Sequence, residues 1–121
     1  MNKNFFEINF KRINTLINKI DKNFPDKLSQ LILKTSKSKK KIIISGNGGS
    51  AATASHVAVD LTLNGKVRAI NFNESDLITC FANDFGYENW LKKSLELYAD
   101  KGDLLIIISC SGESLNLVKA N

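Results

Sequence analysis

Cysteine, proline and histidine are scarce in this chain: its 121 residues include two cysteines, one proline and one histidine. The cysteines, Cys80 and Cys110, are too few for a disulfide scaffold and lack metal-binding spacing, so we expect reduced thiols. No apolar run approaches the roughly 20 residues that a membrane-spanning helix needs, and the N-terminus lacks the apolar core of a secretory signal. These absences predict a cytoplasmic protein without a membrane segment.

Acidic residues are outnumbered, 12 against 17 lysines and arginines, which gives a net charge of +5. Much of the excess lies in residues 34–41, at the end of a predicted helix. A basic run can bind nucleic acid, but this one lacks interleaved aromatic side chains, and lysines at a helix end interact favourably with the helix dipole. We expect a solvated helix terminus and no nucleic-acid partner, although the charge would help to attract anionic substrates.

The first third of the chain has helical periodicity. Apolar side chains recur every three or four residues over 4–22 and again over about 25–37, with Pro25 between the two runs. The first helix has enough apolar surface to serve a subunit interface. The length and the 43% hydrophobic content fit one globular domain, divided into an N-terminal helical segment, 1–38, and the first part of an α/β core, 39–121.

Residues from Lys41 onward alternate between short β-rich runs and helical runs. We predict strands over 41–45, 66–72 and 103–109, and helices over about 50–63 and 86–99 with a short one near 75–82. This alternation predicts a parallel sheet in a three-layer α/β sandwich, with ligands bound at the carboxyl ends of the strands. Residues 115–121 look like the start of a longer helix, so we expect the last third of the fold to be missing and one sheet edge to be open.

Two turns rich in glycine and serine follow predicted strands. The first is Gly46-Asn47-Gly48-Gly49-Ser50, and the second is Ser109-Cys110-Ser111-Gly112-Glu113-Ser114. Glycines let the backbone approach an anion closely, a helix start offers free N–H groups, and serine hydroxyls donate to phosphate oxygens. The serines could equally be local caps of the helix that follows. Together the turns predict a sugar-phosphate or nucleotide site, in which we expect Cys110 to fill space rather than act as a nucleophile.

Two pairs of polar residues accompany these turns. His56 and Asp60 are four residues apart on one helix face, and such a pair can bind a metal ion or transfer protons. The alternative is a half-buried histidine in a structural hydrogen bond, but the preceding phosphate-type loop favours a functional role. Asn83 and Asp84 suit sugar hydroxyls, or equally the N-cap of the helix that follows.

Three segments, in this order, resemble the phosphoheptose isomerases, which are sugar-isomerase (SIS) domain proteins that interconvert sedoheptulose 7-phosphate and a heptose 7-phosphate. They are Gly46-Asn47-Gly48-Gly49-Ser50-Ala51-Ala52 with Ala54-Ser55-His56 and Asp60-Leu61, then Phe81-Ala82-Asn83-Asp84-Phe85-Gly86-Tyr87, then Gly102-Asp103 with Ser109-Cys110-Ser111-Gly112-Glu113-Ser114-Leu115-Asn116. The resemblance covers residues 41–121. It implies a flavodoxin-like SIS fold and a homotetramer with the N-terminal helices at its interfaces.

The resemblance also implies roles for single residues. Substrate contacts would come from Asn47, Gly48, Gly49, Ser50, Asn83, Asp84, Ser109, Cys110, Ser111 and Ser114. His56 corresponds to a zinc ligand, and Asp60 replaces a glutamate, one methylene longer, that serves as metal ligand and base. The family's other metal ligand and acid, a glutamine and a histidine on a later helix, have no counterpart in these 121 residues, so half of a zinc site is expected here.

The sequence therefore predicts an isomerase that interconverts aldose and ketose forms of a sugar phosphate, supplying precursors of heptose-containing surface polysaccharides. Asp60 would move a proton between C1 and C2 through an enediolate, and a metal at His56 would stabilise the negative charge. The alternative is a non-catalytic SIS module that binds a sugar phosphate or a partner protein in regulation.

Overall fold

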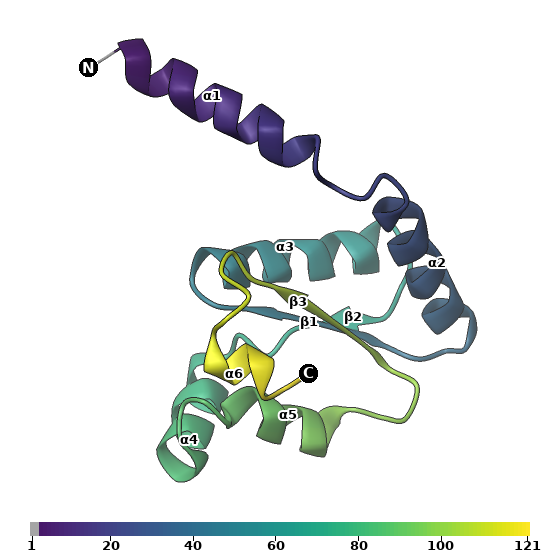
Figure 1. Ribbon diagram of the computed structural model, residues 1–121. Coiled ribbons are helices and arrows are strands. Elements are labelled where there is room, and N and C mark those ends of the chain that lie inside the picture. Colours follow the sequence, from purple (N-terminus) through teal and green to yellow (C-terminus); the bar gives the residue numbers. More distant parts are fainter. Residues whose placement is uncertain (1–2) are drawn as a thin grey trace. The chain divides into compact units, whose positions relative to one another are not determined.

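Figure 1 shows the computed structural model, which describes residues 3–121. The chain divides into two compact units, Met1–Gln30 and Leu31–Asn121. Helix α1 (Lys3–Ile17) belongs to the first unit, and α2 (Phe24–Lys37) begins in the first and ends in the second. Both N-terminal helices that the apolar periodicity predicts are therefore present.

The first helix ends earlier than predicted, at Ile17 rather than at residue 22. The N–H of Lys19 donates to the carbonyl of Leu16 at 3.1 Å, which is a tighter turn than an α-helix makes. The side chain of Asp21 then accepts the N–H of Asn23 at 2.9 Å, and this local bond competes with helix continuation.

Three parallel strands form the sheet of the second unit, in the order β2-β1-β3. They are β1 (Ile42–Gly46), β2 (Ala69–Ile70) and β3 (Leu104–Ile108). Strand β1 is central and every one of its residues is buried, whereas β3 lies at an edge and its five aliphatic residues are only partly buried. The prediction of a parallel sheet with an open apolar edge is confirmed.

Strand β2 is much shorter than the predicted 66–72. Only Ala69 and Ile70 pair with β1. Lys66 has a φ of 52°, which lies outside the extended region, so the strand cannot begin there. After Ile70, the side chain of Asn71 accepts the N–H of Asn73 at 3.0 Å, and this turn ends the strand.

Helices cover both faces of the sheet (Figure 1). They are α3 (Gly49–Leu63), α4 (Ser75–Phe85), α5 (Trp90–Tyr98) and α6 (Leu115–Val118). Helix α4 runs past the predicted residue 82, and α5 starts later than 86, because Gly86 adopts a φ of 84° between them. Among the helices of residues 3–121, none is long and apolar enough to cross a membrane.

Alternate residues of β1 face two separate cores, as the pleat of a strand requires. One core contains Ile42, Ile44, Ala54, Ala58 and Val67, and the other contains Ile43, Phe72, Trp90, Leu91 and Leu117. The first core lies under α3 and the second under α4, α5 and α6, so the unit has three layers (Figure 1). The predicted α/β sandwich is confirmed.

The amino ends of β1 and β3 are joined by charged groups. Lys41 Nζ lies 2.6 Å from Asp103 and 2.8 Å from Asp100, and the Lys41 N–H donates to Asp103 at 2.9 Å. The hydrogen bond with Asp100 raises the pKa of Lys41. Burial opposes ionisation of Asp103, but hydrogen bonds from Lys41 and the Asp100 N–H outweigh it and lower the pKa of that carboxyl. Lys34 and Lys37 end α2 as predicted, but Lys41 is only 12% exposed and is not part of a solvated terminus.

Candidate phosphate-binding site

The turn after β1 is built around Gly46. A Cβ there would lie 2.7 Å from the backbone carbon of Ser50 and 2.9 Å from the carbonyl oxygen of Ile108, so only glycine lets α3 begin directly on the strand ends. Gly48 has a φ of 52°, a left-handed value that favours glycine. Open space surrounds the position of a Cβ at Gly48 or Gly49, so the backbone of this turn is accessible to a ligand.

A pocket of about 510 Å³ opens between the turn after β1 and the turn after β3. It is lined by Asn47, Gly49, Ser50, Thr53, Ile108, Ser109, Cys110, Ser111, Ser114 and Leu117. The carboxyl ends of parallel strands meet at one sheet edge, which is why two turns far apart in sequence share this pocket. The N–H groups of Ser50 and Ala51 already donate to the Asn47 carbonyl, at 2.9 and 3.3 Å, so the start of α3 contributes chiefly the positive end of the helix dipole. Such an arrangement suits a phosphate.

The serine turn keeps its shape through its own hydroxyls. Ser109 Oγ accepts the N–H of Gly112 at 3.0 Å, and Ser111 Oγ accepts the N–H of Glu113 at 3.2 Å. Ser114 is the N-cap residue of α6 but makes no side-chain capping bond. The local bonds are therefore turns within the loop and not a helix cap. A hydroxyl that accepts one bond still has its O–H to donate, so these serines remain available to a ligand.

The thiol of Cys110 is free and exposed on the wall of the pocket. Its sulfur lies 4.0 Å from Ser50 Oγ, which joins the two turns across the pocket. A hydroxyl does not activate a thiol as a base would, and the space-filling role of Cys110 stays a prediction.

Asn47 is held by residues from two other segments. Its side-chain amide exchanges two hydrogen bonds with the amide of Asn116, each 2.9 Å long, and the hydroxyl of Tyr87 donates to Asn47 Oδ1 at 3.4 Å. Asn116 is 2% exposed. In the sequence Asn116 is only the end of the third motif, and nothing in its local pattern shows which residue it pairs with.

Asn83 and Asp84 do not line the pocket. They lie in the last turn of α4, where both are exposed and Asn83 Nδ2 donates to Asp84 at 3.0 Å. The N-cap alternative for this pair is wrong, because α4 continues to Phe85 and the N-cap position of α5 is Asn89. These two predicted substrate contacts are therefore not among the residues that line the pocket.

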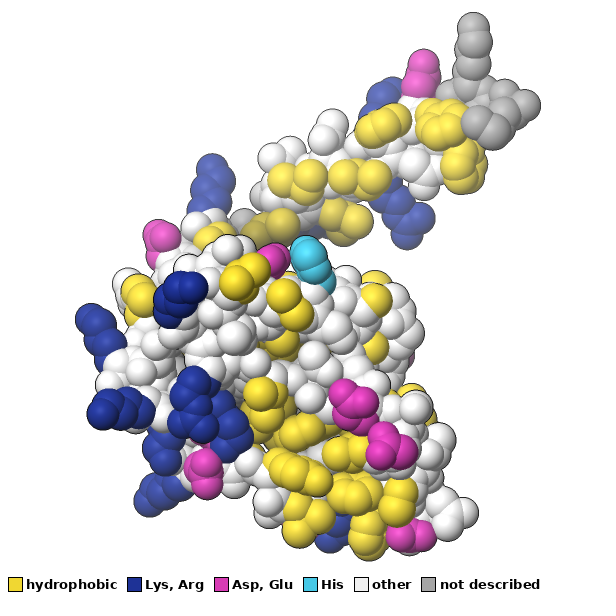
Figure 2. Space-filling model, turned by 180° about the vertical axis from the view of Figure 1, so that it is seen from behind, with side chains coloured by type: hydrophobic (Ala, Val, Ile, Leu, Met, Phe, Trp, Pro, Cys, Tyr) yellow, Lys and Arg dark blue, Asp and Glu magenta, His cyan; other side chains and the backbone are white. Residues whose placement is uncertain are grey.

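His56 and Asp60 face solvent on α3. His56 Nε2 lies 3.5 Å from Asp60 Oδ2, with the side chains 78% and 52% exposed. Figure 2 shows the imidazole, in cyan, beside an acidic side chain at the surface. The prediction of a shared helix face is confirmed, and the half-buried alternative for His56 is wrong. Within residues 3–121, His, Cys, Asp and Glu side chains make no group of three or more that could hold a metal ion.

His56 and Asp60 lie on the face of α3 that also lines the pocket. Thr53 lines the pocket, and His56 and Asp60 follow it at spacings of three and seven residues, which places all three on one side of α3. The helix rise puts Asp60 about 10 Å along the axis from Thr53. A ligand anchored in the pocket would have to be extended to reach Asp60.

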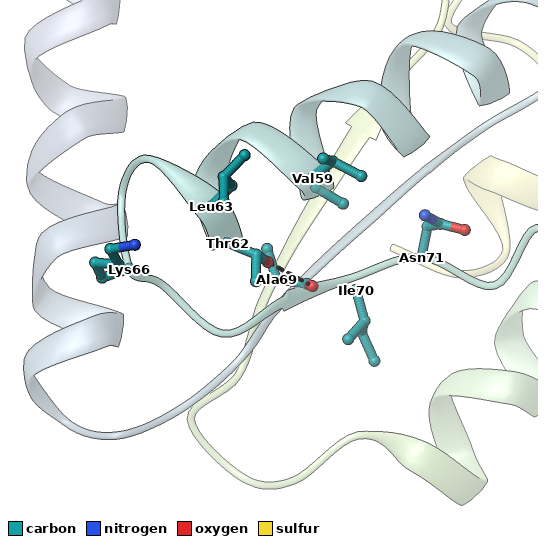
Figure 3. Close-up of a pocket in the computed structure, with 8 residues that line it drawn as sticks. Val59, Thr62, Leu63, Lys66, Ala69, Ile70 and Asn71 are labelled. Carbon is teal, nitrogen blue, oxygen red and sulfur yellow. Dashed lines mark hydrogen bonds between the residues drawn. The ribbon is translucent and has the colours of Figure 1, made fainter.

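A second hollow, of about 500 Å³, lies at the β2 edge of the sheet. Figure 3 shows Val59, Thr62 and Leu63 on α3 above Ala69 and Ile70, with the Thr62 hydroxyl donating to the Ala69 carbonyl at 3.2 Å. Val59 and Leu63 are 57% and 62% exposed. This apolar surface lies beside Asp60 on α3. Lys66 is the charged residue among those that line it.

A parallel α/β domain whose glycine-rich and serine-rich turns meet in a pocket at one sheet edge belongs to the class of α/β domains that place a ligand site at the carboxyl ends of their strands. A family model described as "SIS domain" matches residues 8–121. The chain belongs to the SIS domain family.

Curated relatives carry the name predicted from the motifs. The chain is 39% identical over 101 residues to the phosphoheptose isomerase of Aliarcobacter butzleri, covering 78% of this chain and 53% of the relative. It is 42% identical over 96 residues to that of Helicobacter pylori strain 26695, covering 74% and 50%. The chain thus spans about half the length of the curated relatives that it matches.

Solved structures support the fold. The phosphoheptose isomerase of Neisseria gonorrhoeae superposes with a TM-score of 0.86 at 29% identity, covering 98% of this chain and 66% of that one. The phosphoheptose isomerase of Francisella tularensis gives 0.83 at 21% identity, covering 97% and 64%, and shows the fold alone. The family resemblance and the SIS fold predicted from the sequence are confirmed.

Proposed function

We propose that this chain carries the phosphate-binding part of a phosphoheptose isomerase, which converts sedoheptulose 7-phosphate into an aldose heptose 7-phosphate. The observation that carries the proposal is the pocket in which the turns after β1 and β3 meet. Relatives at 39% and 42% identity are named phosphoheptose isomerase, and they lend no support to a regulatory module.

The pocket would bind the phosphate group. Asn47, Gly48, Gly49 and Ser50 supply the turn at the start of α3, and Ser109, Cys110, Ser111 and Ser114 supply the opposite wall. Backbone N–H groups and hydroxyls both donate, which is what phosphate oxygens accept. Binding energy from this remote group would position the reacting carbons along α3.

Asp60 would be the base. In the ketose it takes a proton from C1 and returns it to C2, while the hydroxyl proton moves from O1 to O2 through an enediolate. Its place about 10 Å along α3 from the pocket suits an extended seven-carbon chain better than a short sugar. His56, 3.5 Å from Asp60, would hold the carboxylate in position. Asn83 and Asp84 remain predicted sugar contacts, outside the pocket.

The described residues do not make a zinc site on their own. His56 and Asp60 offer two donors on one helix face, whereas zinc takes three or four protein ligands. No group of three candidate ligands occurs within residues 3–121. This chain would therefore contribute at most half of a zinc site, and Asp60 itself would carry the proton.

A homo-oligomer, expected to be a tetramer, is part of the proposal. Proton abstraction from carbon works best where water is excluded, yet His56 is 78% exposed. The neighbouring Val59 and Leu63 expose apolar surface that a second subunit would cover, and α1 carries exposed phenylalanines. The two free thiols suit the cytoplasm, where we place this activity.

Proton exchange tests the proposal. The chain is incubated with sedoheptulose 7-phosphate in D₂O, and deuterium at C1 is followed by NMR. Incorporation that falls at least about 100-fold in Asp60→Asn, but persists in the matched surface variant Asp76→Asn, is expected. Binding of the sugar phosphate without any exchange by the unmodified chain would overturn the isomerase and favour a sensor.

A further inference from the structure

The hydrogen-bonding capacity of Asn47 is almost fully used inside the protein. A side-chain amide has two N–H donors and two lone pairs on its oxygen. Both lone pairs of Asn47 are engaged, by the Asn116 amide at 2.9 Å and by the Tyr87 hydroxyl at 3.4 Å. One N–H donates to Asn116 Oδ1, also at 2.9 Å. What Asn47 has left for the pocket that it lines is a single N–H.

We infer that Asn116 is a positioning residue, which holds the Asn47 amide so that it presents one N–H donor to an acceptor oxygen of the ligand. The inference deepens the proposed function and rests on it for the identity of that ligand as a sugar phosphate. Asn116 is 2% exposed and does not line the pocket, so it acts through Asn47. The two residues are 69 positions apart, and their pairing ties the turn after β1 to α6.

The held orientation has a chemical consequence. An N–H donor attracts phosphate, carbonyl and enediolate oxygens, all of which accept hydrogen bonds. If Asn47 were free to rotate its amide, its carbonyl oxygen would face the anion for part of the time and repel it. Asn116 prevents this by requiring both a donor and an acceptor from Asn47 in one fixed geometry.

Two aspartate substitutions separate positioning from mere stability. In Asn116→Asp, a carboxylate accepts from Asn47 but donates nothing, so the Asn47 orientation is lost; the protonated acid again offers both a donor and an acceptor. In Asn47→Asp, the protonated acid also restores the pair, but its only O–H is used by Asn116 and none remains for the ligand. Acid should therefore rescue ligand binding in the first variant and not in the second.

The dissociation constants of inorganic phosphate and of sedoheptulose 7-phosphate are measured by calorimetry at neutral pH and at about pH 5, since burial at position 116 favours the protonated acid. Asn116→Asp should bind about tenfold or more weakly at neutral pH and within about threefold of the unmodified chain in acid. Asn47→Asp should stay about tenfold or more weaker at both pH values.

Other groups titrate near the pair, so each constant is compared with that of the unmodified chain at the same pH. They are Tyr87, which contacts Asn47, Cys110, which lines the pocket, and Glu88, Glu113 and Lys119 on the segments that follow in sequence, together with the phosphate itself. Asn89→Asp is the matched control, because it also adds one negative charge but lies outside the pocket. Its neighbour there is Lys119, whose Nζ is 3.3 Å from Asn89 Oδ1. The affinity of this control should stay within about twofold of the unmodified chain at both pH values.

Equal recovery of both aspartate variants in acid, or of neither, would show that Asn116 has only a structural role. If Asn116→Asp fails to fold at neutral pH, the side-chain amide signals of the unmodified chain decide instead. One Asn47 Nδ2 proton should be protected from exchange and the other should shift on phosphate addition; two equivalent protons would overturn the inference. Failure of the unmodified chain to bind either probe would overturn the proposed function, and the protection of that amide would still report on the pair.

Discussion

The pocket and the His56–Asp60 pair lie along the same helix but are built in different ways. The pocket joins two turns from distant parts of the sequence, and its polar side chains are fixed by hydrogen bonds from several segments. The pair comes from one helical turn, and its side chains are 78% and 52% exposed. Strand pairing thus brings two distant turns together around a pocket. Helix periodicity places His56 and Asp60 on one face but leaves them exposed.

This difference predicts that the pocket governs the affinity for the sugar phosphate and that the pair governs the rate of proton transfer. Substitutions in the pocket should change how tightly a sugar phosphate binds, and substitutions in the pair should change how fast its proton moves.

Gly46→Ala should do the most damage, because its Cβ would lie 2.7 Å from backbone atoms that cannot move independently. We expect a loss of about 2–3 kcal/mol in the free energy of unfolding, measured in urea. Gly49→Ala is the matched variant: no atom lies within 4 Å of its Cβ, so stability should change by less than about 0.5 kcal/mol while phosphate affinity falls. Equal stabilities of the two variants would contradict the structural role of Gly46.

Asp60→Asn should slow C1 deuterium exchange by about 100-fold or more, because it removes the proposed base. Its dissociation constant for sedoheptulose 7-phosphate should stay within about twofold, since Asp60 lies outside the pocket. Calorimetry and NMR on the same sample measure the two quantities. A weakened affinity with an unchanged exchange rate would reverse the assignment of the two regions.

Ser111→Ala should weaken phosphate binding by about fivefold to tenfold, which corresponds to one hydrogen bond of about 1 kcal/mol. The hydroxyl accepts the N–H of Glu113 at 3.2 Å and has its O–H free for a ligand. The control variant Ser38→Ala, at an exposed residue outside the pocket, should leave the phosphate affinity unchanged. If Ser111→Ala binds phosphate normally, the serine turn does not contribute to the site.

The ion pairs of Lys41 with Asp100 and Asp103, at the amino ends of β1 and β3, should affect the stability of the fold and not ligand binding. The pKa of Asp103 is lowered below its unfolded value of about 4, so its contribution is present above that pH and is lost as pH falls through the folded pKa. Asp103→Asn should cost about 1 kcal/mol at neutral pH and flatten the acid slope, measured by urea unfolding from pH 7 downward. Asp76→Asn should keep the slope, and ligand affinity should be unchanged in both.

The sequence predicts the turns that form the pocket better than the hydrogen bonds and ion pairs that hold distant segments together. A strand, a glycine-rich turn and a helix follow one another locally, so the turns at 46–50 and 109–114 can be located without a structure. The Asn47–Asn116 pair depends on two segments 69 residues apart, and no local pattern records it. The same holds for Lys41, whose charge is neutralised by Asp100 and Asp103 in the turn before β3.

Local rules also misplaced some elements. The apolar run 66–72 has strand composition, but the positive φ of Lys66 and the turn at Asn71 limit β2 to two residues. Asn83 and Asp84 suited an N-cap, but Gly86 and not Asp84 interrupts the helix. The exposure of His56 could not be predicted, because helix periodicity gives a side chain its face and not its cover.

The most direct test is a map of amide shifts in the ¹⁵N-labelled chain during titration with sedoheptulose 7-phosphate. We expect the largest shifts in the turns at 46–53 and 109–114, smaller ones along α3 toward Asp60, and little change at the β2 edge. Shifts centred on the hollow beside Val59 and Leu63, with the two turns unaffected, would contradict the assignment of the phosphate pocket.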